Sequence, residues 1–188
     1  MNTTAEGREQ LPGWTSAPLS ALIRHILDTH HAYLRGALPK LTQLLQKTAP
    51  AAGGEQGEAL QAIDQVYRDL RSELESHMWK EEMVLFPLIE GLEQAEAAGR
   101  PAPTAHCGSV RNPIRVMESE HGNAKHALAE LRRLTGGFTA PAGASADSRD
   151  LLTGLAELET DLHSHIHLED AILFPRAGEL ESRLAHAG

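Results

Sequence analysis

Four segments of the chain carry apolar residues at the spacing of an α-helix, and none alternates apolar and polar residues as a half-buried strand would. The segments cover about 19–46, 58–92, 113–134 and 147–177. Stretches rich in Gly, Pro, Ala and Thr separate them, at 48–57, 97–113 and 135–148. Because short connections favour antiparallel neighbours, the pattern predicts an all-α fold, an up-down-up-down antiparallel four-helix bundle.

Local signals refine the ends and the interior of these helices. Ser16 is available to cap the first helix, and Pro18 stands at its start. Pro39, Pro87 and Pro175 fall inside predicted helices, where each removes a backbone donor. We expect bends at these prolines rather than breaks.

Length and charge limit the kind of protein. The 188 residues suit one domain, and we expect a flexible N-terminal segment at 1–16 followed by a single bundle at 17–188. A net charge of -9 without a block of basic residues argues against nucleic acid or a membrane surface as partner. The lone cysteine, Cys107, cannot form an internal disulfide, and the polar start resembles no secretory signal, so we expect a cytoplasmic protein.

Polar residues take the place of apolar ones at six positions of the helical stripes, although a core should be apolar. Each predicted helix supplies one histidine at such a position, and the second and fourth helices also supply a glutamate. The six residues are His31, His77, Glu81, His121, His165 and Glu169.

The spacing of these residues suits metal ligands. Residues four apart lie on one helix face, so His77 and Glu81 can bind the same ion, as can His165 and Glu169. Buried imidazoles and carboxylates are costly unless they are bonded or coordinated, and a mixed nitrogen and oxygen set suits iron, manganese or zinc.

An internal repeat indicates two ions. The segment 77–87 recurs 88 residues later as 165–175, and His31 precedes His121 by a similar 90 residues. Two helical hairpins of one design would therefore face each other. This pseudo-twofold arrangement predicts two metals bridged by the two glutamates.

Other polar residues leave alternatives open. His30 competes with His31 as ligand, and we favour His31 because it lies in register with Leu27 and Leu34. His163 and His167 should face solvent, because two-residue spacing turns them away from His165. Glu73 and Glu120 either line an access path or are simple surface carboxylates, and Cys107 is best interpreted as an ordinary exposed thiol.

The chain resembles the hemerythrin-like domain, and within it the RIC family of di-iron proteins for repair of iron centres. The matching residues are Ala17-Pro18-Leu19, His30-His31-x-Tyr33-Leu34-Arg35, Leu38-Pro39, ELESHMWKEEMVLFP at 73–87, VMESEH at 116–121, and 165–175 followed by Arg176-Ala177. The resemblance implies two non-haem iron ions, oxo- or hydroxo-bridged when oxidised. It also implies that the four histidines are terminal ligands and that Glu81 and Glu169 are bridges.

Two departures separate the sequence from the family pattern. Members commonly carry a short N-terminal domain with a cysteine pair, so the chain resembles a short form that lacks it. A fifth histidine usually follows the first helix, but 49–57 contains none. Glu55, Glu58 or water would take its place.

The resemblance implies a cytoplasmic protein of the nitrosative and oxidative stress response. It would bind nitric oxide, supply iron for damaged iron-sulfur clusters, or do both, with iron-sulfur proteins as partners and as a monomer or homodimer. The alternative is a hemerythrin-like carrier or sensor that binds oxygen reversibly. No signature of a hydrolase or transferase accompanies the metal ligands, and a purely structural site is disfavoured because such sites are normally closed and mononuclear.

Overall fold

A computed structural model describes residues 13–48, 54–103 and 106–186, with the side chains of α3 described from residue 57. The described residues form helices and connections, without a strand. The helices are α1 (Leu19–Ile26), α2 (Ala32–Thr48), α3 (Gly54–Lys80), α4 (Phe86–Ala97), α5 (Arg111–Leu134), α6 (Ala146–Leu168) and α7 (Phe174–His186). Single π-helical turns, at Leu27–His31, Glu81–Leu85 and Glu169–Leu173, join α1 to α2, α3 to α4 and α6 to α7.

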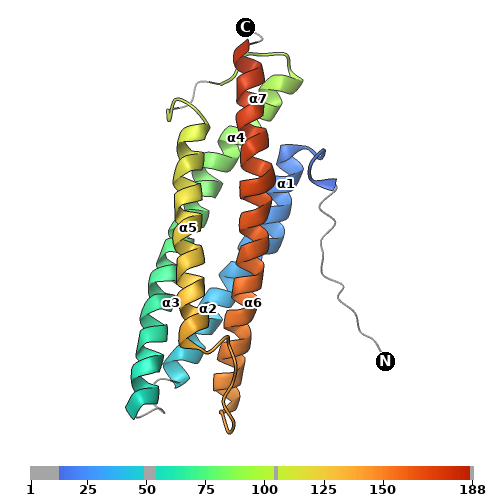
Figure 1. The fold of residues 1–188 in the computed structure, drawn as a ribbon. Helices are drawn as coiled ribbons and strands as arrows, with labels where there is room; N and C mark the ends of the chain where they lie inside the picture. Colours follow the sequence, from blue (N-terminus) through green and yellow to red (C-terminus); the bar gives the residue numbers. More distant parts are fainter. Residues whose placement is uncertain (1–12, 49–53, 104–105, 187–188) are drawn as a thin grey trace, which may run out of the picture.

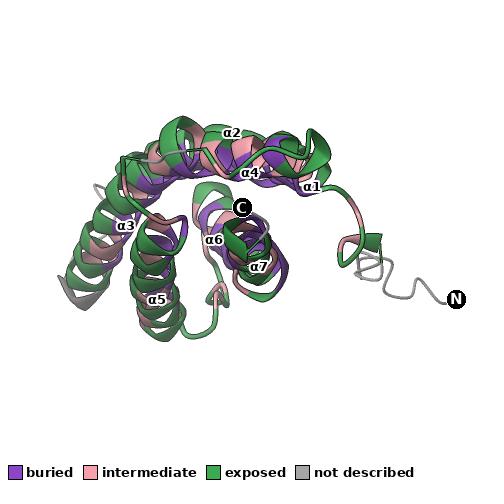
Figure 2. Cartoon of the chain, turned by 90° about the horizontal axis from the view of Figure 1, so that it is seen from above, coloured by how far each residue is buried: buried purple, intermediate pink, exposed green. Residues whose placement is uncertain are grey.

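These elements make four long rods, each antiparallel to the next along the chain (Figure 1). Helix α3 packs on α5 and α2 packs on α6, while α4 contacts α7 and α1. Seen along the bundle, the buried residues face the space between the rods (Figure 2). The predicted four-helix bundle is confirmed.

The apolar core is divided into two clusters. One is built from α1, α4, α7 and the start of α5, and includes Ile26, Phe86 and Phe174. The other is built from α2, α3, α6 and the rest of α5, and includes Leu34, Tyr67 and Leu158. Among the described residues, the five buried histidines, Glu81 and Glu169 lie near the boundary between the two clusters, so a polar layer crosses the middle of the bundle. The other two buried polar residues, Thr48 and Glu159, lie among the residues of the second cluster.

The start of α1 is capped by a residue from another helix, and the prediction of Ser16 as cap is wrong. Pro18 precedes the helix and no local side chain caps it. Instead, Glu93 of α4 accepts hydrogen bonds from the backbone N–H groups of Leu19 at 2.6 Å and Ser20 at 3.1 Å. A carboxylate at a helix N-terminus satisfies otherwise unpaired donors and complements the helix dipole.

None of the three prolines breaks its rod. Helix α2 continues through Pro39. Two of the π-helical turns end two residues before Pro87 and Pro175. A π turn widens the helix, which gives room to a ring that would press on the preceding turn of an ordinary α-helix.

The first rod begins at Leu19 as predicted, but the last rod ends later than predicted. The last rod runs to His186 rather than 177, because Leu180 and Leu184 continue the apolar stripe and are buried. Of the predicted N-terminal segment, residues 1–12 lie outside the described residues. Where the description begins, Arg176 donates hydrogen bonds to the carbonyls of Trp14 and Ala17.

Candidate metal centre

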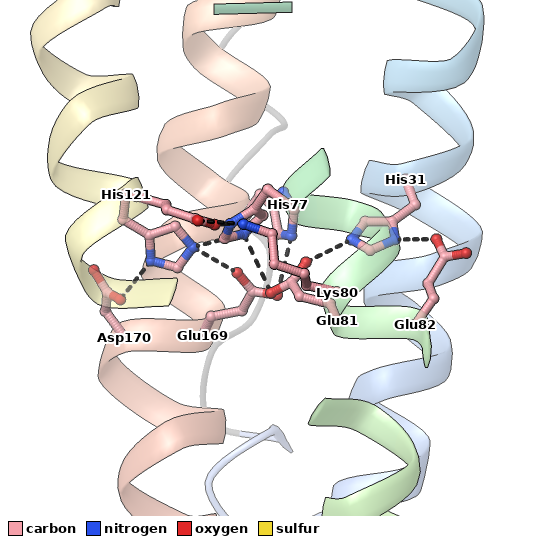
Figure 3. A network of polar contacts seen from close by, with 10 residues as sticks. His31, His77, Lys80, Glu81, Glu82, His121, Glu169 and Asp170 are labelled. Atoms are coloured by element: carbon pink, nitrogen blue, oxygen red, sulfur yellow. Dashed lines mark hydrogen bonds and ion pairs between the residues drawn. The ribbon is translucent and has the colours of Figure 1, made fainter. Parts of the chain in front are cut away.

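All six predicted ligands lie in the polar layer between the two apolar clusters. The two glutamates have no exposed surface, and the four histidines are at most 4% exposed. They come from all four rods, and the five that Figure 3 labels converge on one region. The sixth, His165, lies with them, since its Nε2 is 3.1 Å from Glu169 Oε1.

Each glutamate spans two histidines with its two oxygens. Glu81 Oε2 lies 3.2 Å from His31 Nε2, and Glu81 Oε1 lies 3.3 Å from His77 Nε2. Glu169 repeats this arrangement, with Oε2 3.2 Å from His121 Nε2 and Oε1 3.1 Å from His165 Nε2. Both carboxylates therefore have the placement of bridging ligands.

Two groups of four residues result, and the two glutamates belong to both. One group is His31, Glu81, His165 and Glu169, and the other is His77, Glu81, His121 and Glu169. In each group the candidate ligand atoms lie within 4.8 Å of one another. Each group offers two imidazole nitrogens and two carboxylate oxygens, which is a set suited to one divalent transition metal.

The π-helical turns adjoin this centre. His31 ends the first turn, and Glu81 and Glu169 begin the second and third. Such turns are rare and frequently occur at functional sites. The next residue of the latter two turns, Glu82 or Asp170, reaches a histidine on another rod.

Carboxylates hold the outer nitrogens of three of the four histidines. His31 Nδ1 donates to Glu82 at 2.7 Å, His77 Nδ1 to Glu120 at 2.9 Å, and His121 Nδ1 to Asp170 at 2.7 Å. With Nδ1 protonated, each ring presents Nε2 to the centre, which fixes the tautomer that metal binding requires. These three acidic residues are in turn paired with Arg35, Lys80 and Lys125 respectively.

The fourth histidine, His165, differs. Its Nδ1 is buried and makes no hydrogen bond. The ring of His30 stacks on it in parallel, with centroids 5.2 Å apart. His30 Nδ1 donates to Asp161 at 2.8 Å.

Carboxylates raise the pKa values of three histidines, His31, His77 and His121. Burial by itself lowers the pKa of His31 and His77, but Glu81 raises it, so that both end above the usual value. For His121 burial is likewise outweighed, by Asp170 and Glu169, and the pKa rises to about 9. The pKa of Glu169 lies well below its usual range, because His165 and His121 outweigh its burial.

The residues present fit a bound cation. His31 Nε2, both oxygens of Glu81 and Glu169 Oε2 are buried without a hydrogen bond, although they point at one another. Buried polar atoms that stay unpaired are costly, and a cation at the centre would satisfy all of them at once.

A small free space adjoins the centre on the side of His77 and His121. Its lining includes those two histidines, His165, Glu73 and Glu120. The space is about 20 Å³, where one water needs roughly 10–15 Å³. It therefore suits a molecule of two or three atoms.

The other predicted residues can now be placed. His31 rather than His30 joins the cluster, and His163 and His167 are exposed as expected. Glu120 both lines the free space and holds His77. Cys107 is only half-buried.

Glu58 is wrong as a replacement for the fifth histidine. It is exposed and lies 19 residues before His77 on the same helix, roughly 28 Å away at about 1.5 Å per residue. The side chain of Glu55 lies outside the described residues.

The outer partners Glu82 and Asp170 were not foreseen from the sequence. The sequence does contain a signal for them, because an acidic residue directly follows the predicted bridging glutamate in both copies of the repeat. A partner of an imidazole on another rod can only be assigned once the rods are packed.

An antiparallel bundle whose core holds two buried groups of histidines and glutamates, with both glutamates shared, defines the class of four-helix bundles with a candidate cation-binding site in the core. Comparison with known proteins specifies the family. Residues 22–177 match the model of the hemerythrin HHE cation binding domain. The chain belongs to this hemerythrin family, in the branch whose curated members are named iron-sulfur cluster repair proteins.

Three relatives illustrate that branch, each named iron-sulfur cluster repair protein YtfE. The one from Edwardsiella ictaluri is 39% identical over 169 residues, which cover 90% of this chain and 70% of the relative. Those from Yersinia pseudotuberculosis serotype IB and Yersinia pestis strain Pestoides F are each 36% identical, over 87% of this chain and 68% of the relative.

Proposed function

We propose that this protein acts in the nitrosative and oxidative stress response, where it supplies iron for the repair of damaged iron-sulfur clusters and binds nitric oxide. The proposed ligands of a di-iron centre are His31, His77, His121 and His165 as terminal ligands and Glu81 and Glu169 as bridges. The observation that carries the proposal is the pair of buried groups that share both glutamates. The names of the relatives add the cluster-repair role.

Iron in this site would supply redox chemistry, a coordination position for a diatomic, and a store of transferable metal. The side chains make the store reversible. Because the pKa of His121 is raised to about 9, its imidazole holds a proton at pH 7 when no metal is bound. Protons on the histidines compensate the negative charge of the buried glutamates, so iron can dissociate without exposing the core to unpaired negative charge.

The free space beside His77 and His121 supports the nitric oxide part of the proposal. It is large enough for a diatomic, and its wall includes three proposed ligands, His77 and His121 of one metal position and His165 of the other. Glu73 and Glu120 lie on the same wall.

Iron transfer is the direct test. The iron-loaded protein should restore the visible absorption of an apo-ferredoxin, in the presence of sulfide and a thiol reductant, faster than the same amount of free ferrous iron. The Glu81→Ala variant should not, and the His163→Ala variant should behave as the parent. A rate no higher than that of free ferrous iron would refute the role in iron supply.

The competing function is a reversible oxygen carrier or sensor, and the names of the relatives favour repair. Anaerobic reduced protein should give a stable spectral change with nitric oxide and an irreversible one with oxygen. If removal of oxygen restores the spectrum of the reduced protein, the result would support the oxygen carrier instead.

We place the protein in the cytoplasm, where a single cysteine stays reduced. Among the described residues, no helix combines the length and the hydrophobicity needed to cross a bilayer. Iron-sulfur proteins are the proposed partners, and the choice between monomer and homodimer stays a prediction for solution measurement.

A further inference from the structure

The two candidate metal positions have the same inner ligands, so any difference between them must come from the residues behind those ligands. The position formed by His77 and His121 is here called position 1, and the position formed by His31 and His165 is called position 2. Both positions share Glu81 and Glu169, and each of the four histidine Nε2 atoms lies 3.1 to 3.3 Å from a carboxylate oxygen of one of these glutamates. Both pairs of histidines are almost fully buried.

At position 1 both histidines have a carboxylate behind them. Glu120 accepts from His77 Nδ1, and Asp170 accepts from His121 Nδ1. Lys80 and Lys125 pair with these two carboxylates and hold them in place. Each ring is therefore fixed at its outer edge.

At position 2 only one histidine has such a partner. Glu82 accepts from His31 Nδ1, whereas His165 Nδ1 is buried without a hydrogen bond. The internal repeat explains the difference. In the repeat, His77 corresponds to His165, and Glu120 corresponds to His30, because they directly precede the matched residues His121 and His31. A histidine thus occupies the place where the other half has a carboxylate.

His30 cannot substitute for that carboxylate. Its ring lies parallel to the ring of His165, with an interplanar angle of 1° and centroids 5.2 Å apart, and the structure gives no hydrogen bond between the two rings. Its Nδ1 is committed to Asp161, and its Nε2 is buried without a hydrogen bond. Asp161 Oδ2 is buried and unpaired as well.

A carboxylate behind a ligating histidine orients the ring and increases its strength as a donor, and loss of such a partner costs about 10–100-fold in metal affinity. We propose that the two metal positions are unequal: position 1 fills first, and the ion at position 2 is bound about 10–100-fold more weakly and is the one available for transfer. The inequality rests on the proposed ligand set, and its use in transfer rests on the proposed function.

The test uses Zn²⁺, a redox-inert probe, added to the metal-free full chain and followed by the ¹⁵N signals of the histidine rings. The first equivalent should shift the signals of His77 and His121, and the second should shift those of His31 and His165. Calorimetry should show two steps whose dissociation constants differ by about 10–100-fold. Simultaneous filling, or filling of position 2 first, would overturn the proposal.

Two variants test the cause. Glu120→Gln removes one partner from position 1 and should bring the two binding steps together, while Glu118→Gln, an exposed glutamate on the same helix, should leave them separate. The double variant His30→Glu with Asp161→Asn should tighten the second step, because it gives His165 the kind of partner that His77 has. Circular dichroism checks that each variant folds, and unchanged steps in folded Glu120→Gln would contradict the assignment.

The zinc experiment also separates this inference from the proposed function. Unequal zinc binding without restoration of apo-ferredoxin by the iron-loaded protein would leave the inequality standing and refute iron supply. Equal zinc binding at the two positions, together with restoration of apo-ferredoxin, would refute the inequality and leave the role in iron supply standing.

Discussion

At the scale of single residues, Glu81 and Glu169 account for most of the chemistry of the site. They have no exposed surface, and two buried carboxylates would be strongly destabilising without compensating charge. Four imidazoles surround them, and neighbouring carboxylates raise the pKa of three of these, which favours the protonated form that compensates the charge.

Removal of one bridge should remove metal. We expect Glu81→Ala to reduce the metal content from about two ions per chain to one or fewer, because both groups lose an oxygen ligand. Elemental analysis of purified protein measures this. His163→Ala, which changes an exposed histidine two residues from His165, is the matched control and should keep about two ions.

Equal loss of metal in Glu81→Ala and His163→Ala would show that the ligand register is wrong. An unchanged content in Glu81→Ala would show that this residue is not a ligand.

The six residues of the cluster could be predicted from sequence, because each interrupts an apolar stripe and four of them recur in a repeat. Their outer partners could not. Glu82 and Asp170 are ordinary acidic residues in sequence, and only the packing of one rod on another brings them to His31 and His121.

At the scale of elements, the π-helical turns and the cap from Glu93 show what the helical pattern leaves open. An apolar stripe predicts a helix but not the extra residue of a π turn, which shifts the register by one position at the centre. The cap lies more than 70 residues from the helix that it stabilises. Neither feature has a local signature.

The cap from Glu93 can be tested by stability. Glu93→Ala should lower the free energy of unfolding by about 1–2 kcal/mol, since it leaves two backbone N–H groups of α1 without their acceptor. Urea unfolding of the metal-free protein measures the change. Gln94→Ala, at the exposed neighbouring position, should have a much smaller effect, and equal effects would argue against the cap.

At the scale of the whole molecule, the polar layer makes the stability of the metal-free bundle depend on pH. A histidine whose pKa is raised by folding stabilises the fold fully at pH values below its pKa in the unfolded chain, about 6.5. This stabilisation is lost as the pH rises through its pKa in the folded protein, which is about 9 for His121. Glu169 has a lowered pKa and acts in the opposite sense, since its contribution is lost in acid. Stability should therefore be greatest between about pH 4.5 and 6.5.

We expect the free energy of unfolding of the metal-free protein to fall by a few kcal/mol between about pH 6.5 and 9.5. Urea titrations at fixed ionic strength measure it. The metal-loaded protein serves as control and should not lose stability over this range, because the metal replaces the protons on the imidazoles. Metal-free protein that becomes more stable as the pH rises would contradict the assignment.

The sequence by itself determined the number of rods, their order and the six side chains that enter the core, because periodicity and repeats are properties of the chain. The tertiary structure decided which atoms meet: that each glutamate spans two histidines, that three histidines have a carboxylate behind them, and that His165 has the ring of His30 instead. The physical reason is the separation along the chain of the residues that interact. Helical pattern is set by residues a few positions apart, whereas these contacts join residues that only the packing of four rods brings together.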